Sequence, residues 1–294
     1  MTAAIAPIIE ARNLTKSFGR KKVLHGLSFT IPAGRIYGLV GHNGAGKTTT
    51  LNAILGLTDC EGTISVLGMN PFAERARLMN NVAFISDVAS LPRFLKVREL
   101  FDLIEDIHPN FSREKANVFL QGTDLKPDLK IKTLSKGMVA QLHLAVVMAI
   151  DAKLLVLDEP TLGLDITYRK RFYRRLIEDY MTEERTLLIT THQVDEIEFM
   201  LTDIMFVRDG EIVLDAPTDE VGTVYTQLVT DGDNVAKAEA LQPLFTETRF
   251  GQTVMVFENV SRDNLEPLGS VSTPTISDLF VALMQRQSAN PGDK

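Results

Sequence analysis

Residues 41–49 read GHNGAGKTT, and this loop decides how the rest of the chain is interpreted. It fits the pattern G-x-x-x-x-G-K-[ST], in which glycines allow backbone N–H groups to turn inward around phosphate oxygens. A short apolar run at residues 35–40 precedes the loop, and residues 48–57 have helical spacing. The expected order is therefore strand, loop and helix, and the positive end of such a helix points at bound phosphate.

The side chains of this loop predict how a nucleoside triphosphate would be held. Lys47 is expected to reach the β- and γ-phosphates, and the Thr48 hydroxyl is expected to ligate Mg²⁺. Backbone groups of the remaining positions would surround the phosphate oxygens. The predicted nucleotide-binding residues of the loop are Gly41, Asn43, Gly44, Ala45, Gly46, Lys47, Thr48 and Thr49.

A second segment, residues 154–160, reads LLVLDEP and has the pattern of a buried strand that ends in two carboxylates. Asp158 is expected to hold Mg²⁺ through a water molecule, and Glu159 to polarise the attacking water as a general base. A buried strand would deliver both rigidly to the carboxyl edge of a sheet, where ligands bind in such folds. Together with the phosphate loop, this segment predicts hydrolysis of ATP.

A third segment, residues 134–138, reads LSKGM and directly precedes a stretch with helical spacing that runs to about residue 150. The Ser135 hydroxyl and the helix N-terminus can both bind a γ-phosphate, and Lys136 and Gly137 lie beside them. The five residues alone do not exclude a plain helix cap, with Ser135 capping the helix and nothing more. The segment gains its meaning from its place between the phosphate loop and the acidic strand end.

Composition narrows the class of protein. The 294 residues are 45% hydrophobic and 23% charged, which is typical of a globular chain. A net charge of -7 and a pI near 5.4 lower the expectation of nucleic-acid binding. The single Cys60 cannot form an intrachain disulfide, which fits a reducing compartment. The N-terminus lacks the pattern of a signal peptide, and no apolar run approaches the roughly 18 residues that cross a bilayer, so we expect a soluble chain.

Strands that alternate with helices predict an α/β core with a parallel sheet. Residues 8–31 favour an opening β-layer, and residues of about 88–150 favour an inserted helical subdomain. After residue 218 the pattern changes, so we expect a nucleotide-binding domain at 1–218 and a small α+β accessory domain at 219–294. The arginines and lysine at residues 169–175 are interpreted as a mostly solvated helix face.

In combination these segments resemble the ATP-binding subunit of an ABC transporter, over roughly residues 5–217. The resemblance implies a P-loop ABC ATPase core, and it implies three further site residues. Phe18 matches the aromatic that stacks on adenine, and His192 matches the switch histidine that contacts the γ-phosphate. Asp165, in the TLGLD stretch at residues 161–165, matches the loop that links two sites across a dimer.

Two segments depart from the family pattern. The common form of the third segment is LSGGQ, so Lys136 adds a cation and Met138 loses an amide. The family also has a glutamine after the strand at residues 82–85, where Asp87 stands here. Because Mg²⁺ prefers hard oxygen ligands, Asp87 is expected to bind the metal directly, with tighter Mg²⁺ dependence and altered coupling.

The resemblance implies a clamp of two copies, either a homodimer or a pairing with a related ATPase chain. Each ATP would lie between one copy's phosphate loop and the other copy's LSKGM segment. The closing and opening of this clamp would move separate membrane-spanning permease subunits. The chain would therefore lie in the cytoplasm, at the inner face of the membrane. The ending at residues 275–283 resembles the tails of exporter ATPases, so export is favoured over import.

Two other functions remain open at this point. A soluble ABC-type ATPase acting on nucleic acid or ribosomes usually carries two nucleotide-binding units or a long coiled coil, and this acidic chain shows neither. No nucleic-acid partner is therefore expected. A nucleotide switch that rarely hydrolyses is disfavoured because Glu159 is present. The transported substrate does not follow from the sequence.

Overall fold

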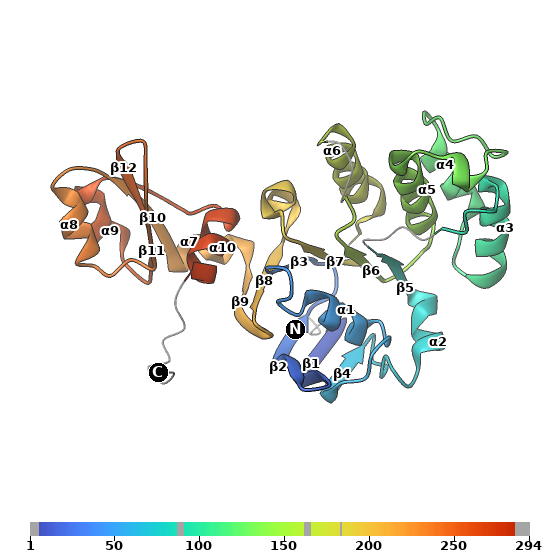
Figure 1. Ribbon diagram of the computed structural model, residues 1–294, viewed down its shortest axis with the longest axis horizontal. Coiled ribbons are helices and arrows are strands. Elements are labelled where there is room, and N and C mark those ends of the chain that lie inside the picture. Colours follow the sequence, from blue (N-terminus) through green and yellow to red (C-terminus); the bar gives the residue numbers. More distant parts are fainter. Residues whose placement is uncertain (1–5, 87–90, 162–165, 183, 286–294) are drawn as a thin grey trace, which may run out of the picture. The chain divides into compact units, whose positions relative to one another are not determined.

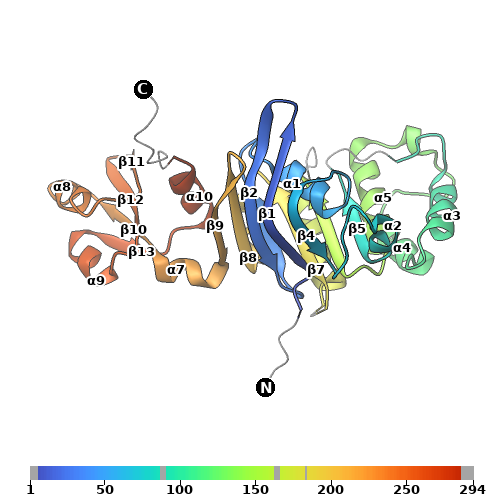
Figure 2. The ribbon, with the colours of Figure 1, turned by 90° about the horizontal axis from the view of Figure 1, so that it is seen from below.

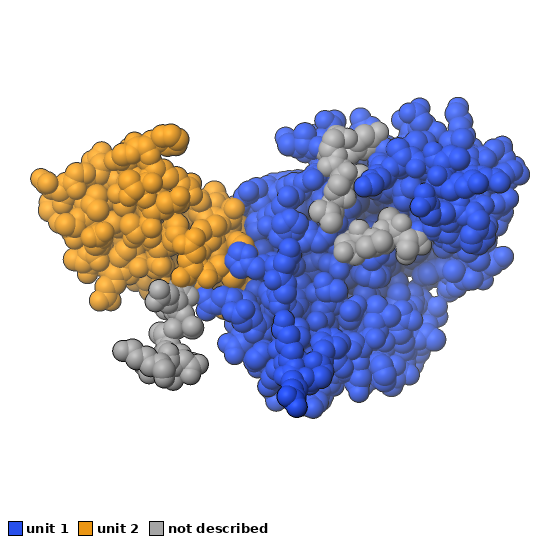
Figure 3. Space-filling view, viewed as in Figure 1, with its two compact units in different colours: residues 1–201, 207–212 blue, residues 202–206, 213–294 orange. Residues whose placement is uncertain are grey.

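The computed structural model describes residues 6–86, 91–161, 166–182 and 184–285 (Figure 1). The chain divides into two compact units, drawn in different colours in Figure 3. The first comprises residues 1–201 and 207–212, and the second comprises residues 202–206 and 213–294. No helix in the described part of the chain combines the length and apolar character needed to span a bilayer.

The first unit opens with a three-stranded antiparallel layer in the order β2-β1-β4. Its strands are β1 (Ile9–Phe18), β2 (Lys21–Ile31) and β4 (Glu61–Val66). Ile9 pairs with Ile31 on one side and Val66 on the other, and all three are buried, so an apolar face is formed across the layer. Figure 2 shows this layer with α1 (Lys47–Ile54) beside it.

A second sheet carries six strands in the order β5-β6-β7-β3-β8-β9. They are β3 (Ile36–Val40), β5 (Val82–Ile85), β6 (Leu154–Asp158), β7 (Thr186–Thr191), β8 (Asp203–Arg208) and β9 (Glu211–Pro217). β5, β6, β7 and β3 pair in parallel. Every residue of β3, β6 and β7 is buried, as expected for parallel strands covered on both faces. The expected α/β core with an opening β-layer is confirmed.

Helices between β5 and β6 have a core of their own. They are α3 (Val97–Ile107), α4 (Arg113–Leu120) and α5 (Lys136–Met148), and Leu100, Ala116 and Leu142 are among the residues they bury together. The Glu99 carboxylate accepts from the Lys96 N–H at 2.8 Å and so caps α3. The inserted subdomain predicted at about 88–150 begins at residues outside the described ranges, so its boundary stays a prediction.

Two further helices complete the first unit. α2 (Arg75–Leu78) precedes β5, and α6 (Ile166–Arg175) lies between β6 and β7 in the chain. α6 continues into a π-helical turn at Leu176–Tyr180, where the Tyr180 hydroxyl donates to the Ala152 carbonyl at 3.1 Å. This bond anchors the end of the helix beside the start of β6.

The second unit contains a four-stranded antiparallel sheet in the order β11-β12-β10-β13. Its elements follow one another as strand, helix, two strands, helix and strand, which is the ferredoxin-like arrangement. Leu228, Met255 and Phe257 form the core with Ala238 and Leu265 from the helices. The elements are α7 (Val221–Val224), β10 (Tyr225–Thr230), α8 (Asn234–Glu239), β11 (Phe245–Arg249), β12 (Gln252–Glu258), α9 (Arg262–Leu265), β13 (Ser270–Ser272) and α10 (Ile276–Gln285).

The second compact unit also takes in residues that precede the predicted domain boundary at 218/219. Residues 203–206 of β8 and 213–217 of β9 cluster with the second unit, as does Thr202 before β8. Phe206 meets Phe280 of α10 edge to face, with ring centroids 5.2 Å apart. The role of 219–294 as an accessory domain stays a prediction.

Replacing Phe257 with alanine should destabilise the second unit. The side chain is 0% exposed, and such truncations cost about 3–5 kcal/mol because they lose burial and leave a cavity. Calorimetric unfolding of the whole chain would show a lower transition temperature. Phe250→Ala is the matched control, since Phe250 is fully exposed and surface changes usually stay within about 0.5 kcal/mol. Equal losses in both variants would contradict the described core.

His143 should make the free energy of unfolding depend on pH. Its Nδ1 atom is buried without a hydrogen-bond partner among the described residues, and desolvation lowers its pKa from 6.5 to about 4. Because the folded pKa lies below the unfolded one, this group's stabilisation is complete above the unfolded value. It is lost as pH falls from about 6.5 to about 4, by about 3 kcal/mol at most.

Denaturant unfolding at several pH values checks this expectation. His143→Leu should flatten the pH dependence in that window, and Phe250→Ala should leave it unchanged because Phe250 is exposed and does not titrate. A wild-type curve that matches the His143→Leu curve across the window would show that the histidine is not buried in its neutral form.

Candidate functional site

The phosphate loop connects β3 to α1, and glycine is required at two of its positions. A Cβ on Gly41 would lie 2.4 Å from the Val207 carbonyl oxygen, so no larger residue fits without a backbone shift. Gly46 is the N-cap of α1 and has φ +109°, a backbone conformation that residues with a side chain rarely adopt. These constraints place Lys47 at the first position of α1, one residue before the start expected from the sequence at residue 48.

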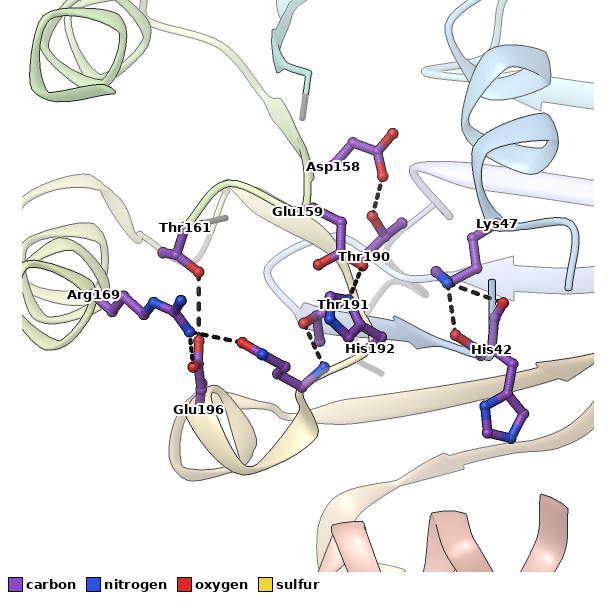
Figure 4. A network of polar contacts seen from close by, with 12 residues as sticks. His42, Lys47, Asp158, Glu159, Thr161, Arg169, Thr190, Thr191, His192 and Glu196 are labelled. Carbon is purple, nitrogen blue, oxygen red and sulfur yellow. Dashed lines mark hydrogen bonds and ion pairs between the residues drawn. The ribbon is translucent and has the colours of Figure 1, made fainter. Parts of the chain in front are cut away.

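Lys47 is buried inside its own loop. Its Nζ atom donates to the carbonyls of Gly41 at 2.6 Å and His42 at 3.3 Å (Figure 4). Desolvation lowers the pKa of the ammonium, and the charges of Glu159 and Asp158 oppose this effect. The lysine is therefore held between backbone oxygens and two carboxylates, ready to neutralise an anion.

The acidic residues follow from the parallel pairing of β6 and β7. Asp158 pairs in register with Thr190, whose hydroxyl donates to the Asp158 carboxylate inside the core. Glu159 comes next and has φ +47°, a left-handed conformation that costs a residue other than glycine on the order of 1–3 kcal/mol. Its N–H donates to the Thr190 carbonyl at 3.1 Å. The turn directs the Glu159 carboxylate toward β7.

His192 completes this group. Its Nδ1 atom lies 2.8 Å from Glu159 Oε1, within hydrogen-bond distance. A cavity of about 510 Å³ joins these side chains to the phosphate loop. It is lined by Val23, Asn43, Gly44, Gly46, Lys47, Thr48, Thr49, Asp158, Glu159 and His192. Its volume is that of a small-molecule site, and three strand ends contribute to it.

Other predicted residues lie elsewhere. Phe18 ends β1 with 56% of its surface exposed, and the Lys16 Nζ atom lies 5.5 Å from its ring centroid. Ser135 caps α5 by accepting from the Met138 N–H at 3.2 Å, and Lys136 is exposed beside it. Neither these residues nor Gly137 line the cavity in the described part of the chain. Gly41 and Ala45 belong to the phosphate loop, where both are buried. Asp87 and Asp165 lie outside the described residues.

The sequence did not predict the ion pair between Arg169 and Glu196, two residues that do not line the cavity in the described part of the chain. Arg169 was expected on a solvated face, and this is wrong: its side chain is only 19% exposed and pairs with Glu196. Lys170, Arg171 and Arg174 are exposed, as expected. Thr190 was also missed, although a polar residue in the apolar strand TLLITT is a recognisable signal.

Comparison with known proteins identifies this class of site. Residues 24–162 match the ABC transporter family. Nod factor export ATP-binding protein I of Burkholderia lata is 39% identical over 214 residues, which cover 70% of this chain and 69% of that protein. The ABC transporter ATP-binding protein YtrB of Bacillus subtilis is 29% identical, over 85% of this chain and 86% of its own.

Solved structures agree at the level of the fold. An ATP-binding subunit of an ABC transporter superposes with a TM-score of 0.67 at 23% identity, covering 74% of this chain and 92% of its own. An ATP-binding cassette of an ABC transporter in its ADP conformation gives 0.62 at 24% identity, covering 73% and 92%. The fold and the site thus define a P-loop ABC ATPase.

The chain belongs to the ABC transporter family, in which it is an ATP-binding subunit that hydrolyses ATP. The resemblance read from the motifs is confirmed, and so are the predicted fold and ATPase activity. The transporter function is favoured over a soluble ATPase acting on nucleic acid or ribosomes.

Thr190→Val should weaken the support of Asp158. The substitution keeps the side-chain volume but removes the hydroxyl that donates to the buried carboxylate. An acceptor that loses such a partner costs about 1–3 kcal/mol. Denaturant unfolding should show this loss for Thr190→Val and a smaller one for Thr190→Ser, which keeps the hydroxyl. No loss in Thr190→Val, together with a loss in Thr190→Ser, would mean that the methyl group rather than the hydrogen bond matters.

Proposed function

We propose that this chain powers export through separate membrane-spanning permease subunits, by closing and opening a clamp of two ATPase chains. The observation that carries the proposal is the convergence of Lys47, Asp158, Glu159 and His192 on one cavity. Support for export comes from relatives whose names state that role, such as Nod factor export ATP-binding protein I. Because the proposed permease partner lies in the membrane, this chain would act in the cytoplasm, at the inner face of that membrane.

In the proposed reaction the backbone N–H groups of the phosphate loop surround the phosphates of ATP, and Phe18 stacks on the adenine. Lys47 neutralises charge on the β- and γ-phosphates. Glu159 accepts a proton from the attacking water as the water oxygen forms a bond to the γ-phosphorus. The bond from that phosphorus to the bridging oxygen breaks, and ADP and phosphate are the products. His192, held at 2.8 Å from Glu159, orients this carboxylate and contacts the γ-phosphate.

Mg²⁺ fits the chemistry of the side chains present. Asp158 supplies a buried carboxylate oxygen and Thr48 a hydroxyl, both at the cavity. Mg²⁺ keeps several waters and is held by one or two carboxylates plus substrate phosphates. This agrees with the described residues, which contain no group of three or more acidic, histidine or cysteine ligands. Mg²⁺ would offset the negative charge of the phosphates, and we propose Asp87 as a further ligand.

The cross-subunit element is proposed at the start of α5. Ser135 and the N-terminus of this 13-residue helix would bind the γ-phosphate held by a second copy, with Lys136 and Gly137 beside it. Lys136 would add positive charge at the phosphates or the ribose. Asp165 would link the two sites across the dimer, whether the partner is an identical chain or a related one. Residues 219–294 would form an accessory domain.

The variant Glu159→Gln should bind ATP and dimerise without completing turnover. Loss of a general base typically lowers rates by about 10²–10⁴-fold, so the ATP-bound closed state accumulates. Size-exclusion chromatography with light scattering, with and without MgATP, measures the dimer.

The double variant Glu159→Gln/Ser135→Arg is the control, because a bulky cation replaces the predicted γ-phosphate contact. It should bind ATP and remain monomeric. A dimer in both proteins would exclude the Ser135 contact, and unchanged ATP turnover in Glu159→Gln would exclude the proposed base.

A further inference from the structure

We propose that Arg169 is a positioning residue for ATP hydrolysis. It fixes the positions of Glu159 and His192 through contacts outside the lining of the cavity. The inference rests on the roles proposed above for Glu159 and His192. It concerns a residue that does not line the cavity in the described part of the chain. Arg169 acts through its neighbours and touches no reacting atom.

The first half of the argument is the contact between Arg169 and the segment that follows His192. Arg169 lies on α6, and its Nη1 atom donates to Gln193 Oε1 at 2.7 Å (Figure 4). The same guanidinium forms an ion pair with Glu196, in the short 3-10 turn Val194–Glu196. The side chains of Arg169 and Glu196 are only 19% and 26% exposed, so the pair is screened less than a surface pair.

The second half is the contact with the segment that follows Glu159. Thr161 Oγ1 lies 3.5 Å from Glu196 Oε2 and 3.1 Å from the hydroxyl of Tyr173, also on α6. Thr161 is buried, and burial raises the pKa of Tyr173, so the phenol keeps its proton and can donate. Glu196 therefore receives contacts from both sides, from Arg169 and from Thr161.

These contacts close a ring through the two proposed hydrolytic residues. Glu159 is two residues before Thr161, and His192 is directly before Gln193. Glu159 and His192 meet at 2.8 Å on the cavity side, and Thr161, Glu196, Arg169 and Gln193 join the same two segments on the other side.

The backbone of Glu159 explains why this support is needed. Its φ of +47° is uncommon for a residue other than glycine. Such conformations persist only where the surrounding structure fixes them. Removing Arg169 takes away the ion-pair partner of Glu196 and the side-chain contact of Gln193. The Thr161–Glu196 contact is then left to join the two segments on this side, so the ends of both strands are held less firmly. A mutation far from the reacting atoms that misplaces a catalytic group by about 1 Å can lower the rate about 100-fold.

Arg169→Ala should therefore lower kcat for ATP by about 10- to 100-fold. KM and the Kd for a fluorescent ATP analogue should change little, because the phosphate loop is intact. In wild type a single nitrogen, Nη1, contacts both Gln193 and Glu196. Arg169→Lys keeps the charge but places a compact ammonium on a flexible stem, so an intermediate kcat is expected. Lys170→Ala and Arg174→Ala, on the exposed part of the same helix, are the matched controls and should retain wild-type kcat.

A charge swap separates positioning from general damage to the fold. Arg169→Glu and Glu196→Arg should each lower kcat, and the double variant should recover part of it. The double variant restores the ion pair with the two charges exchanged. The Gln193 amide can turn its NH₂ group toward the new carboxylate, and the Thr161 hydroxyl can accept from the new arginine. Thermal unfolding of every variant monitors the fold.

The outcomes distinguish this inference from the proposed function. Wild-type kcat in Arg169→Ala, with turnover abolished in Glu159→Gln, overturns the positioning role and leaves the proposed function standing. Turnover that persists in Glu159→Gln overturns the proposed base, and this inference with it. A swapped variant that regains the wild-type Tm without regaining kcat also overturns the inference, because the pair would then serve stability alone.

Discussion

The site depends on one constraint, the parallel pairing of β6 with β7. The register sets Asp158 opposite Thr190, and the next residues along these strands lead directly to Glu159 and His192. Since the carboxyl ends of parallel strands meet at one edge of a sheet, two segments more than thirty residues apart in the chain supply a contact of 2.8 Å. β3 pairs with β7 on its other side and brings the phosphate loop to the same edge.

The polar side chains at this edge of the sheet differ in how deeply they are buried. Asp158, Glu159 and His192 all line the cavity, but Asp158 is buried and its carboxylate accepts from the Thr190 hydroxyl, while the Glu159 and His192 side chains are more exposed. A buried carboxylate fixed by one hydrogen bond is well placed to bind a metal with its remaining lone pairs, and the more exposed carboxylate beside His192 is well placed to accept a proton. The different depths of two consecutive residues thus allow different tasks.

The sequence predicted these parts unevenly, for physical reasons. The phosphate loop and the strand LLVLDEP were recognisable because their function depends on backbone geometry and on residues that are consecutive in the chain. The pairing of Arg169 with Glu196 was not, because the residues are 27 positions apart and a row of basic residues reads as a solvated helix face. The ferredoxin-like order of the second unit also exceeded what short strand patterns could indicate. The contact proposed between Ser135 and a second chain depends on a partner, so a single chain does not determine it.

The way Lys47 is held has a thermodynamic consequence. The ammonium group is already surrounded by the carbonyls of Gly41 and His42, and the glycine geometry of the loop is set by close contacts within the fold. Ordering the loop is therefore paid for during folding, and a phosphate ligand meets a preorganised surface. Nucleotide association would then exchange one set of lysine partners for another, with little further cost of ordering this loop.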